Sequence, residues 1–271
     1  MKKVITSCFQ LAVLIFISTV YANEVPAENC KEVAESRLQQ NTEVCLDWGN
    51  QILVMQDAPK DLINEAAAAN MFVAENIVKT NPPKSISHYS LSWDLAQKSQ
   101  EPSFVALIAA NYGVLLNSNS QFSQTLKISP IAIKAAKVIS QEPNKSVLTF
   151  RLMNNYADAL RLNKQFTEAK PIYQWLINAS KNSLEANVYG TLLNNWAICL
   201  EKTKELDRAN AVYAEAVRLT NESLDENSNL IKSNYAGFLA EFSTDLSQEK
   251  PAFVSIIGNG IKLPVDMLET K

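Results

Sequence analysis

The fold is decided by two stretches that align with an offset of 40 residues: RLMNNYADALRLNKQFTEAKPIYQWLINAS at 151–180 and TLLNNWAICLEKTKELDRANAVYAEAVRLT at 191–220. Eight positions are identical, namely Leu152 and Leu192, Asn154 and Asn194, Asn155 and Asn195, Ala157 and Ala197, Leu160 and Leu200, Lys164 and Lys204, Ala169 and Ala209, and Tyr173 and Tyr213. Ala157 and Ala169 are expected where two helices cross so closely that only a small side chain fits. Tyr156, Leu160 and Tyr173 would fill the space around that crossing. The same helix-pair unit is therefore predicted twice.

Outside these stretches, apolar residues also recur at spacings of three and four, and sustained alternation appears only in the last twenty residues. Turn-forming residues interrupt the pattern at regular places. The breaks fall at Ala58-Pro59, Asn81-Pro82-Pro83, Glu101-Pro102, Asn117–Ser120, Glu142-Pro143-Asn144, Asn163–Gln165, Lys181–Ser183, Thr203–Glu205 and Leu224–Asn227. We expect an all-α protein whose helices, each about 12 to 20 residues long, stack as antiparallel pairs.

The small and aromatic positions resemble the tetratricopeptide repeat. They read Tyr156-Ala157-x-x-Leu160 with Ala169-x-x-x-Tyr173, and Trp196-Ala197-x-x-Leu200 with Ala209-x-x-x-Tyr213; two flanking first helices match as Asn111-Tyr112-Gly113-x-x-Leu116 and Asn234-Tyr235-Ala236-x-x-Leu239. The closing proline of the family is absent, and the spacings of 44, 40 and 39 between Asn-aromatic pairs exceed the usual period of about 34. The longer period resembles kinesin-light-chain-type repeats, while HEAT or armadillo repeats are the alternative. The resemblance implies a right-handed solenoid.

Five segments follow from this pattern. Residues 1–22 are predicted to be a signal peptide, 23–58 a disulfide-stapled helical segment, 59–100 an irregular capping helix pair, 101–245 the helical repeats and 246–271 a small extended tail. In the tail, Phe253–Ile257, Gly258-Asn259-Gly260 and Ile261–Val265 are typical of a hairpin or an extended flap.

The amino terminus has the pattern of an export signal. Lys2 and Lys3 precede an apolar run that is densest at 11–20, and Val20-Tyr21-Ala22 has the small-x-small character of a cleavage site. We expect cleavage after Ala22, a periplasmic or secreted bacterial protein, and no membrane insertion after cleavage. An uncleaved anchor over 4–22 is the alternative.

Export changes how the four cysteines are read, because disulfides persist outside the cytoplasm. Cys8 would leave with the signal, and a disulfide between Cys30 and Cys45 is predicted because the pair is close in sequence and well separated from Cys199. A straight helix between them would separate their Cα atoms by roughly 22 Å, so the chain is predicted to reverse near 39–42. Two free thiols with a metal or catalytic role are the alternative. Cys199 matches the small position of Ala159 and is predicted to be a buried, inert thiol.

Composition excludes several function classes. The chain has 25 Lys and Arg against 28 Asp and Glu among 271 residues, which is unlike the basic surface of a nucleic-acid-binding protein. Its six glycines form neither a dinucleotide-binding nor a P-loop motif. The single histidine, His88, excludes multi-histidine metal sites and is predicted to be a cap or surface residue. We expect no enzyme activity, no cofactor and no metal.

The candidate site is a ladder of asparagines, each directly before the aromatic residue of a first helix: Asn111, Asn155, Asn195 and Asn234. The resemblance implies that first helices line a concave face on which such asparagines hydrogen-bond the backbone of an extended peptide. The alternative is that they bridge neighbouring helices. Asn154, Asp158, Arg161, Asn194, Glu201 and Lys202 are expected to share this face.

The function predicted from this site is a non-enzymatic interaction scaffold that holds an extended segment of a partner protein. Two alternatives stay open. One is a hydrolase that uses carboxylates on a helical toroid, although the 8% aromatic residues and few glycines argue against it. The other is a structural subunit that packs through its convex face or its tail.

Overall fold

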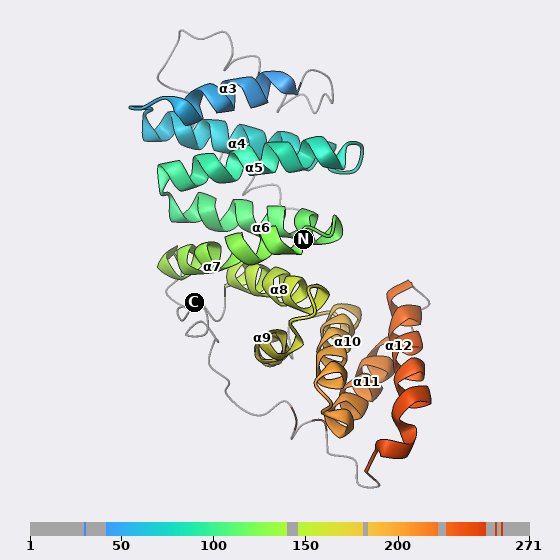
Figure 1. Ribbon diagram of the computed structural model, residues 1–271. Coiled ribbons are helices and arrows are strands. Elements are labelled where there is room, and N and C mark those ends of the chain that lie inside the picture. Colours follow the sequence, from blue (N-terminus) through green and yellow to red (C-terminus); the bar gives the residue numbers. More distant parts are fainter. Residues whose placement is uncertain are drawn as a thin grey trace. The chain divides into compact units, whose positions relative to one another are not determined.

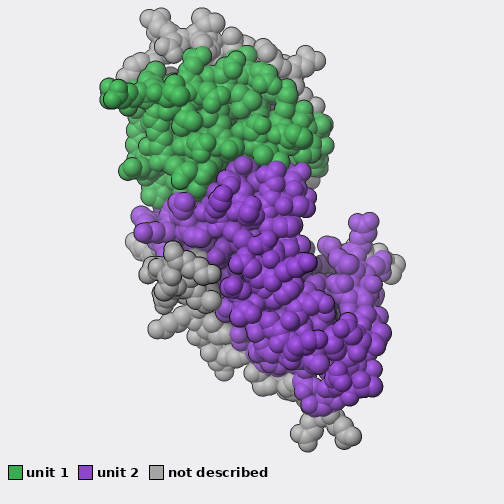
Figure 2. All heavy atoms as spheres, in the orientation of Figure 1, with its two compact units in different colours: residues 1–108 green, residues 109–271 purple. Residues whose placement is uncertain are grey.

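The computed structural model describes Cys30, residues 42–139, 146–180, 184–221 and 226–247, Phe253 and Ile256. Every element in these residues is an α-helix or a short 3-10 helix, which confirms the all-α prediction. The chain divides at residue 108 into two compact units, the N-terminal unit 1–108 and the C-terminal unit 109–271, coloured separately in Figure 2. Each is described by itself below.

The N-terminal unit contains α3 (Glu43–Val54), α4 (Lys60–Ile77) and α5 (Pro82–Ser99), which pack against one another in all three pairs. The predicted break at Asn81-Pro82-Pro83 is the start of α5: the Asn81 side chain accepts a hydrogen bond from the Lys84 N–H, and the prolines occupy the first turn. At the C-terminal end of α3, Lys98 Nζ donates to the carbonyl oxygens of Ile52 and Leu53 at 2.9 and 2.8 Å. A cation thus caps the negative end of the α3 dipole.

The division between the units falls within α6 (Pro102–Ser118). The C-terminal unit then contains α7 (Phe122–Ile139), α8 (Val147–Leu162), α9 (Phe166–Ser180), α10 (Ala186–Lys202), α11 (Leu206–Thr220) and α12 (Glu226–Phe242), followed by the 3-10 turn η2 (Ser243–Asp245). From α7 onward each helix packs on the next, and α10 also contacts both α8 and α12 (Figure 1). Contacts between consecutive helices and between alternate helices are the packing expected of a helical solenoid.

The same turn joins the two helices of each pair in this unit. Ser120, Lys164 and Lys204 all have left-handed backbone, with φ of 60°, 62° and 62°. In each turn the next N–H returns to a carbonyl in the last turn of the helix: Gln121 to Leu116, Gln165 to Leu160 and Glu205 to Leu200, at 2.8, 2.8 and 2.9 Å. This pattern is a Schellman cap, in which the left-handed residue reverses the chain. The sequence repeat therefore corresponds to a repeat of backbone geometry, and it includes the turn after α6.

The small residues of the repeat lie at helix crossings, as predicted. Ala157, Ala169, Ala197 and Ala209 are each 0% exposed, and Tyr173 and Tyr213 are buried beside them. The matching small residue of α12, Ala236, is exposed. An alanine at this position is buried only where a second helix packs across it.

The two ends of the chain test few of the remaining predictions. The signal peptide and nearly all of the predicted reversal at 39–42 lie outside the described residues. Of the predicted hairpin, Phe253 and Ile256 are described, and both are helical instead of extended. Ile256 is buried, and its carbonyl oxygen accepts a hydrogen bond from Gln174 on α9.

Candidate functional site

A cavity of about 410 Å³ opens on the first helices of the pairs in the C-terminal unit. It is lined by Val114 of α6, by Phe150, Arg151, Asn154, Asn155 and Asp158 of α8, by Asn187, Val188, Thr191, Leu192 and Asn195 of α10, and by Asn227 of α12. The polar lining residues of α8 stand three and four positions apart, as do Asn187, Thr191 and Asn195 on α10, so each set shares one helix face. The cavity is a half-open hollow on the surface of these helices.

Asp158 is the centre of the polar network at this cavity. Its Oδ1 accepts hydrogen bonds from the Tyr173 hydroxyl at 2.5 Å, from Asn195 Nδ2 at 3.1 Å and from Arg161 Nη2 at 3.4 Å. Its Oδ2 accepts one from Asn154 Nδ2 at 3.3 Å. The carboxylate therefore connects α8, α9 and α10 and has its negative charge compensated by Arg161. Burial, and secondarily the Asp158 charge, hold the pKa of Tyr173 well above its ordinary value, so its hydroxyl stays a donor.

Each asparagine of the ladder is hydrogen-bonded to a neighbouring first helix. Asn155 Nδ2 donates to the Ala110 carbonyl oxygen at 2.8 Å, and Asn111 Oδ1 accepts from Arg151 Nη2 at 2.6 Å. Asn195 donates to Asp158, and Asn234 Nδ2 donates to Asn194 Oδ1 at 3.0 Å. The bridging role that the sequence left open as the alternative is thus the arrangement in this structure.

Asn155 offers little surface to a peptide, because it is 5% exposed and fits against Gly113. A Cβ on Gly113 would lie 3.0 Å from Asn155 Nδ2, which explains why this first helix has glycine where the other three have alanine. Asn117 Nδ2 adds a second bond between α6 and α8, to the Asn155 carbonyl oxygen at 2.8 Å. Asn155 is a structural bridge at the base of the cavity.

The cavity brings together four of the predicted residues, Asn154, Asn155, Asp158 and Asn195. Glu201 lies elsewhere: it is buried, accepts from the Tyr213 hydroxyl at 2.8 Å and pairs with Lys202 at 2.7 Å. Arg161 and Glu201 stand at matching repeat positions, and each contacts the tyrosine of its own pair. Asn111, Asn194 and Asn234 contact cavity helices without lining the cavity.

The apolar and hydroxyl groups of the cavity were not predicted from the sequence. Val114, Phe150, Val188, Thr191 and Leu192 line it together with the amides. Helical spacing from the ladder could have found part of this set, since Thr191 stands four residues before Asn195 on the same face. The positions of Val114 and Val188 depend on how neighbouring helices align.

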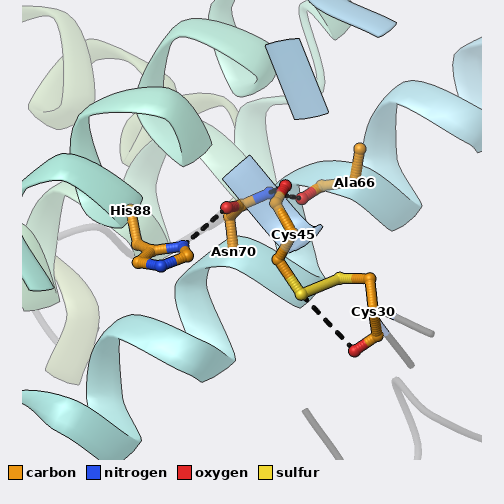
Figure 3. The surroundings of a disulfide bond; sticks show 5 residues. All are labelled: Cys30, Cys45, Ala66, Asn70 and His88. Carbon is orange, nitrogen blue, oxygen red and sulfur yellow. Dashed lines mark hydrogen bonds between the residues drawn. A yellow bond between two sulfur atoms is a disulfide. The ribbon is translucent and has the colours of Figure 1, made fainter. Parts of the chain in front are cut away.

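A second polar cluster lies in the N-terminal unit beside the disulfide (Figure 3). Cys30 and Cys45 form the predicted bond, with their Cα atoms 4.9 Å apart. Asn70 Nδ2 donates to the carbonyl oxygens of Cys45 and Ala66, both at 3.0 Å, and Asn70 Oδ1 lies 2.8 Å from His88 Nδ1. Since both donors of the Asn70 amide face carbonyls, Nδ1 carries the imidazole hydrogen and donates to Oδ1.

The prediction that His88 is a cap or surface residue was wrong. His88 is 0% exposed, because α5 is covered on this face by both α3 and α4. Burial lowers its pKa to about 4, an effect that Glu43 opposes and Lys84 adds to. Its Nε2 has no hydrogen-bond partner within the described part of the chain. The ring is a neutral link between α4 and α5.

Cys199 agrees with its prediction. The thiol is free and 0% exposed, and burial raises its pKa to about 12. The thiolate that nucleophilic or redox chemistry requires is therefore disfavoured in the folded chain.

No family model matches the chain, and no curated protein matches it. Across the described ranges, no group of three or more His, Cys, Asp and Glu side chains has the geometry to hold a metal ion. No helix in these ranges has both the length and the hydropathy needed to cross a bilayer.

Proposed function

We propose that this protein is a non-enzymatic interaction scaffold of the bacterial periplasm or exterior that binds an extended segment of a partner protein. The binding site is the cavity on α6, α8 and α10. The observation that carries the proposal is the convergence of side-chain amides on one cavity whose carboxylate is already hydrogen-bonded from three helices. Amides offer a donor and an acceptor together and so suit a peptide main chain.

The accessible polar groups of this site are not the same as the asparagine ladder that the sequence predicts. Asn154 and Asn195 are half-buried and line the cavity, whereas the Asn155 side chain is hydrogen-bonded to the backbone of α6. In the proposal, the bridging asparagines fix the spacing of the first helices, and Asn154, Thr191 and Asn195 contact the ligand. The tetratricopeptide resemblance supports the same face, and the Cys30–Cys45 bond supports an oxidising compartment.

The proposal is tested by a substitution that blocks the cavity and removes none of the asparagine hydrogen bonds between the first helices. Thr191 lines the cavity, and its hydroxyl donates to the Asn187 carbonyl oxygen of the same helix at 2.9 Å. Thr191→Arg would place a long side chain in the cavity. Ala214→Arg is the matched control, because Ala214 is exposed on α11 and does not line it.

Purified full-length protein is used to select binders from a random linear peptide library, and their affinities are measured by fluorescence anisotropy. Thr191→Arg is expected to weaken binding by about tenfold or more, and Ala214→Arg to change it by less than about twofold. A library that yields no binder, or binders indifferent to Thr191→Arg, would remove the cavity as a peptide site. The convex face would then be the surface to test.

A further inference from the structure

Two valines that line the cavity are about half exposed. Val114 on α6 is 53% exposed, and Val188 on α10 is 48% exposed. The other apolar lining residues are less exposed, since Phe150 is half-buried and Leu192 is buried. A large apolar side chain at the surface is common when it stands alone. Here the two stand on different helices and face one concave space.

The cavity lining holds two charged side chains, Asp158 and Arg151. Asp158 has both oxygens engaged, and Arg161 compensates its charge. Arg151 is exposed and directs Nη2 to the uncharged Asn111 Oδ1 at 2.6 Å, a contact that leaves its positive charge uncompensated. The remaining polar lining groups are amides and the Thr191 hydroxyl. An apolar side chain of a ligand would remove the valine surfaces from water, while Arg151 and the amides would face its polar groups.

From these two observations we infer that the partner segment carries an aliphatic or aromatic anchor residue within a polar stretch. The anchor side chain packs between Val114 and Val188, while the amides of Asn154 and Asn195 hydrogen-bond the main chain beside it. The inference rests on the proposed function and adds the chemical class of segment that the site selects. Apolar anchors in pockets commonly dominate the affinity of such contacts.

Peptides selected on the full-length protein test the inference through their sequences and through Val188. The expected consensus has one invariant aliphatic or aromatic position. Replacing that residue by serine, or Val188 by aspartate in the protein, is expected to weaken binding by about tenfold or more. Val188→Leu should retain affinity within about threefold, because it keeps the wall apolar.

The matched control is Val138→Asp, since Val138 is 72% exposed on α7, which contributes no lining residue. It should leave affinity within about twofold of the parent. A consensus of charged residues, or full affinity in Val188→Asp, would overturn the inference while leaving the proposed site intact. Peptides whose binding is blocked by Thr191→Arg but whose consensus has no apolar position would likewise overturn the inference and leave the proposed site intact. If no peptide were selected at all, the proposed function itself would be contradicted.

Discussion

Asn155 Nδ2 lies 2.8 Å from the carbonyl oxygen of Ala110, so a buried amide on α8 ties that helix to α6 across the base of the cavity. Asn155, which the sequence predicts to hydrogen-bond a peptide backbone, therefore holds two helices together instead. Asn154, its neighbour in sequence, lines the cavity and donates only to Asp158 of its own helix. Adjacent asparagines in one helix thus have different structural roles.

This difference predicts opposite effects of two alanine substitutions. Asn155→Ala should lower the free energy of unfolding by about 1 to 2 kcal/mol, because it removes a buried hydrogen bond and leaves a void beside Gly113. Asn154→Ala, the control, should cost less than about 0.5 kcal/mol and should reduce peptide affinity instead. Urea unfolding followed by circular dichroism gives the first quantity and anisotropy the second. Equal stability of the two variants would contradict the framework role of Asn155.

His88 should make the stability of the protein depend on pH between about 6.5 and 4. Burial lowers the pKa of the folded ring to about 4 from an ordinary 6.5. As pH falls below 6.5 the unfolded chain takes up a proton that the folded chain does not, so stability is lost until pH reaches about 4. The loss is on the order of 2 to 3 kcal/mol. Glu43 and Lys84 are the charged groups that act on the ring.

His88→Gln is the variant that isolates this effect, because a glutamine amide can still donate to Asn70 Oδ1 but does not titrate. Urea unfolding free energies measured at several pH values are expected to show a flatter slope for His88→Gln than for the parent across this window. Parallel slopes would mean that carboxylates alone cause the acid sensitivity.

Overpacking at the repeated crossings should distinguish the paired helices from α12. Ala169→Leu and Ala209→Leu should each destabilise the protein by roughly 1 to 3 kcal/mol, because both alanines are 0% exposed between helices. Ala236→Leu should change stability by less than about 0.5 kcal/mol, because Ala236 is exposed. Thermal melts of the three variants provide the comparison. A penalty at Ala236 as large as at Ala209 would imply that a further segment covers α12.

The cysteines should differ sharply in reactivity. Alkylation of unfolded, unreduced protein followed by peptide mapping should label Cys199 and leave Cys30 and Cys45 linked. The folded protein should protect Cys199, whose thiol is buried and has a pKa raised to about 12. Cys30→Ala with Cys45→Ala should lower stability by about 3 kcal/mol, as expected for a loop of this length. Rapid labelling of Cys199 in the folded state would contradict its buried position.

The sequence by itself determined the backbone of this protein. Prolines and asparagines at the breaks specify where α4, α5 and α6 begin, because they act within one turn of the chain. Ser146 caps the start of α8. The offset of 40 residues predicted the buried alanines and tyrosines, since small residues at a crossing are required by local helix geometry. Cys30 and Cys45 could be paired because chain proximity restricts the choice.

Only the tertiary structure decided which polar groups meet. His88 follows two prolines in a polar stretch, yet α3 and α4 both cover it, and neither contact is encoded near residue 88. Asn155 and Asn154 differ only by the rotation of about 100° between adjacent helix positions, and that rotation matters only once α6 lies alongside. Hydrogen-bond partners such as Ala110 and Asn155 stand 45 residues apart, so their pairing depends on how whole helices align. Periodicity gives each helix its face, and packing determines what that face contacts.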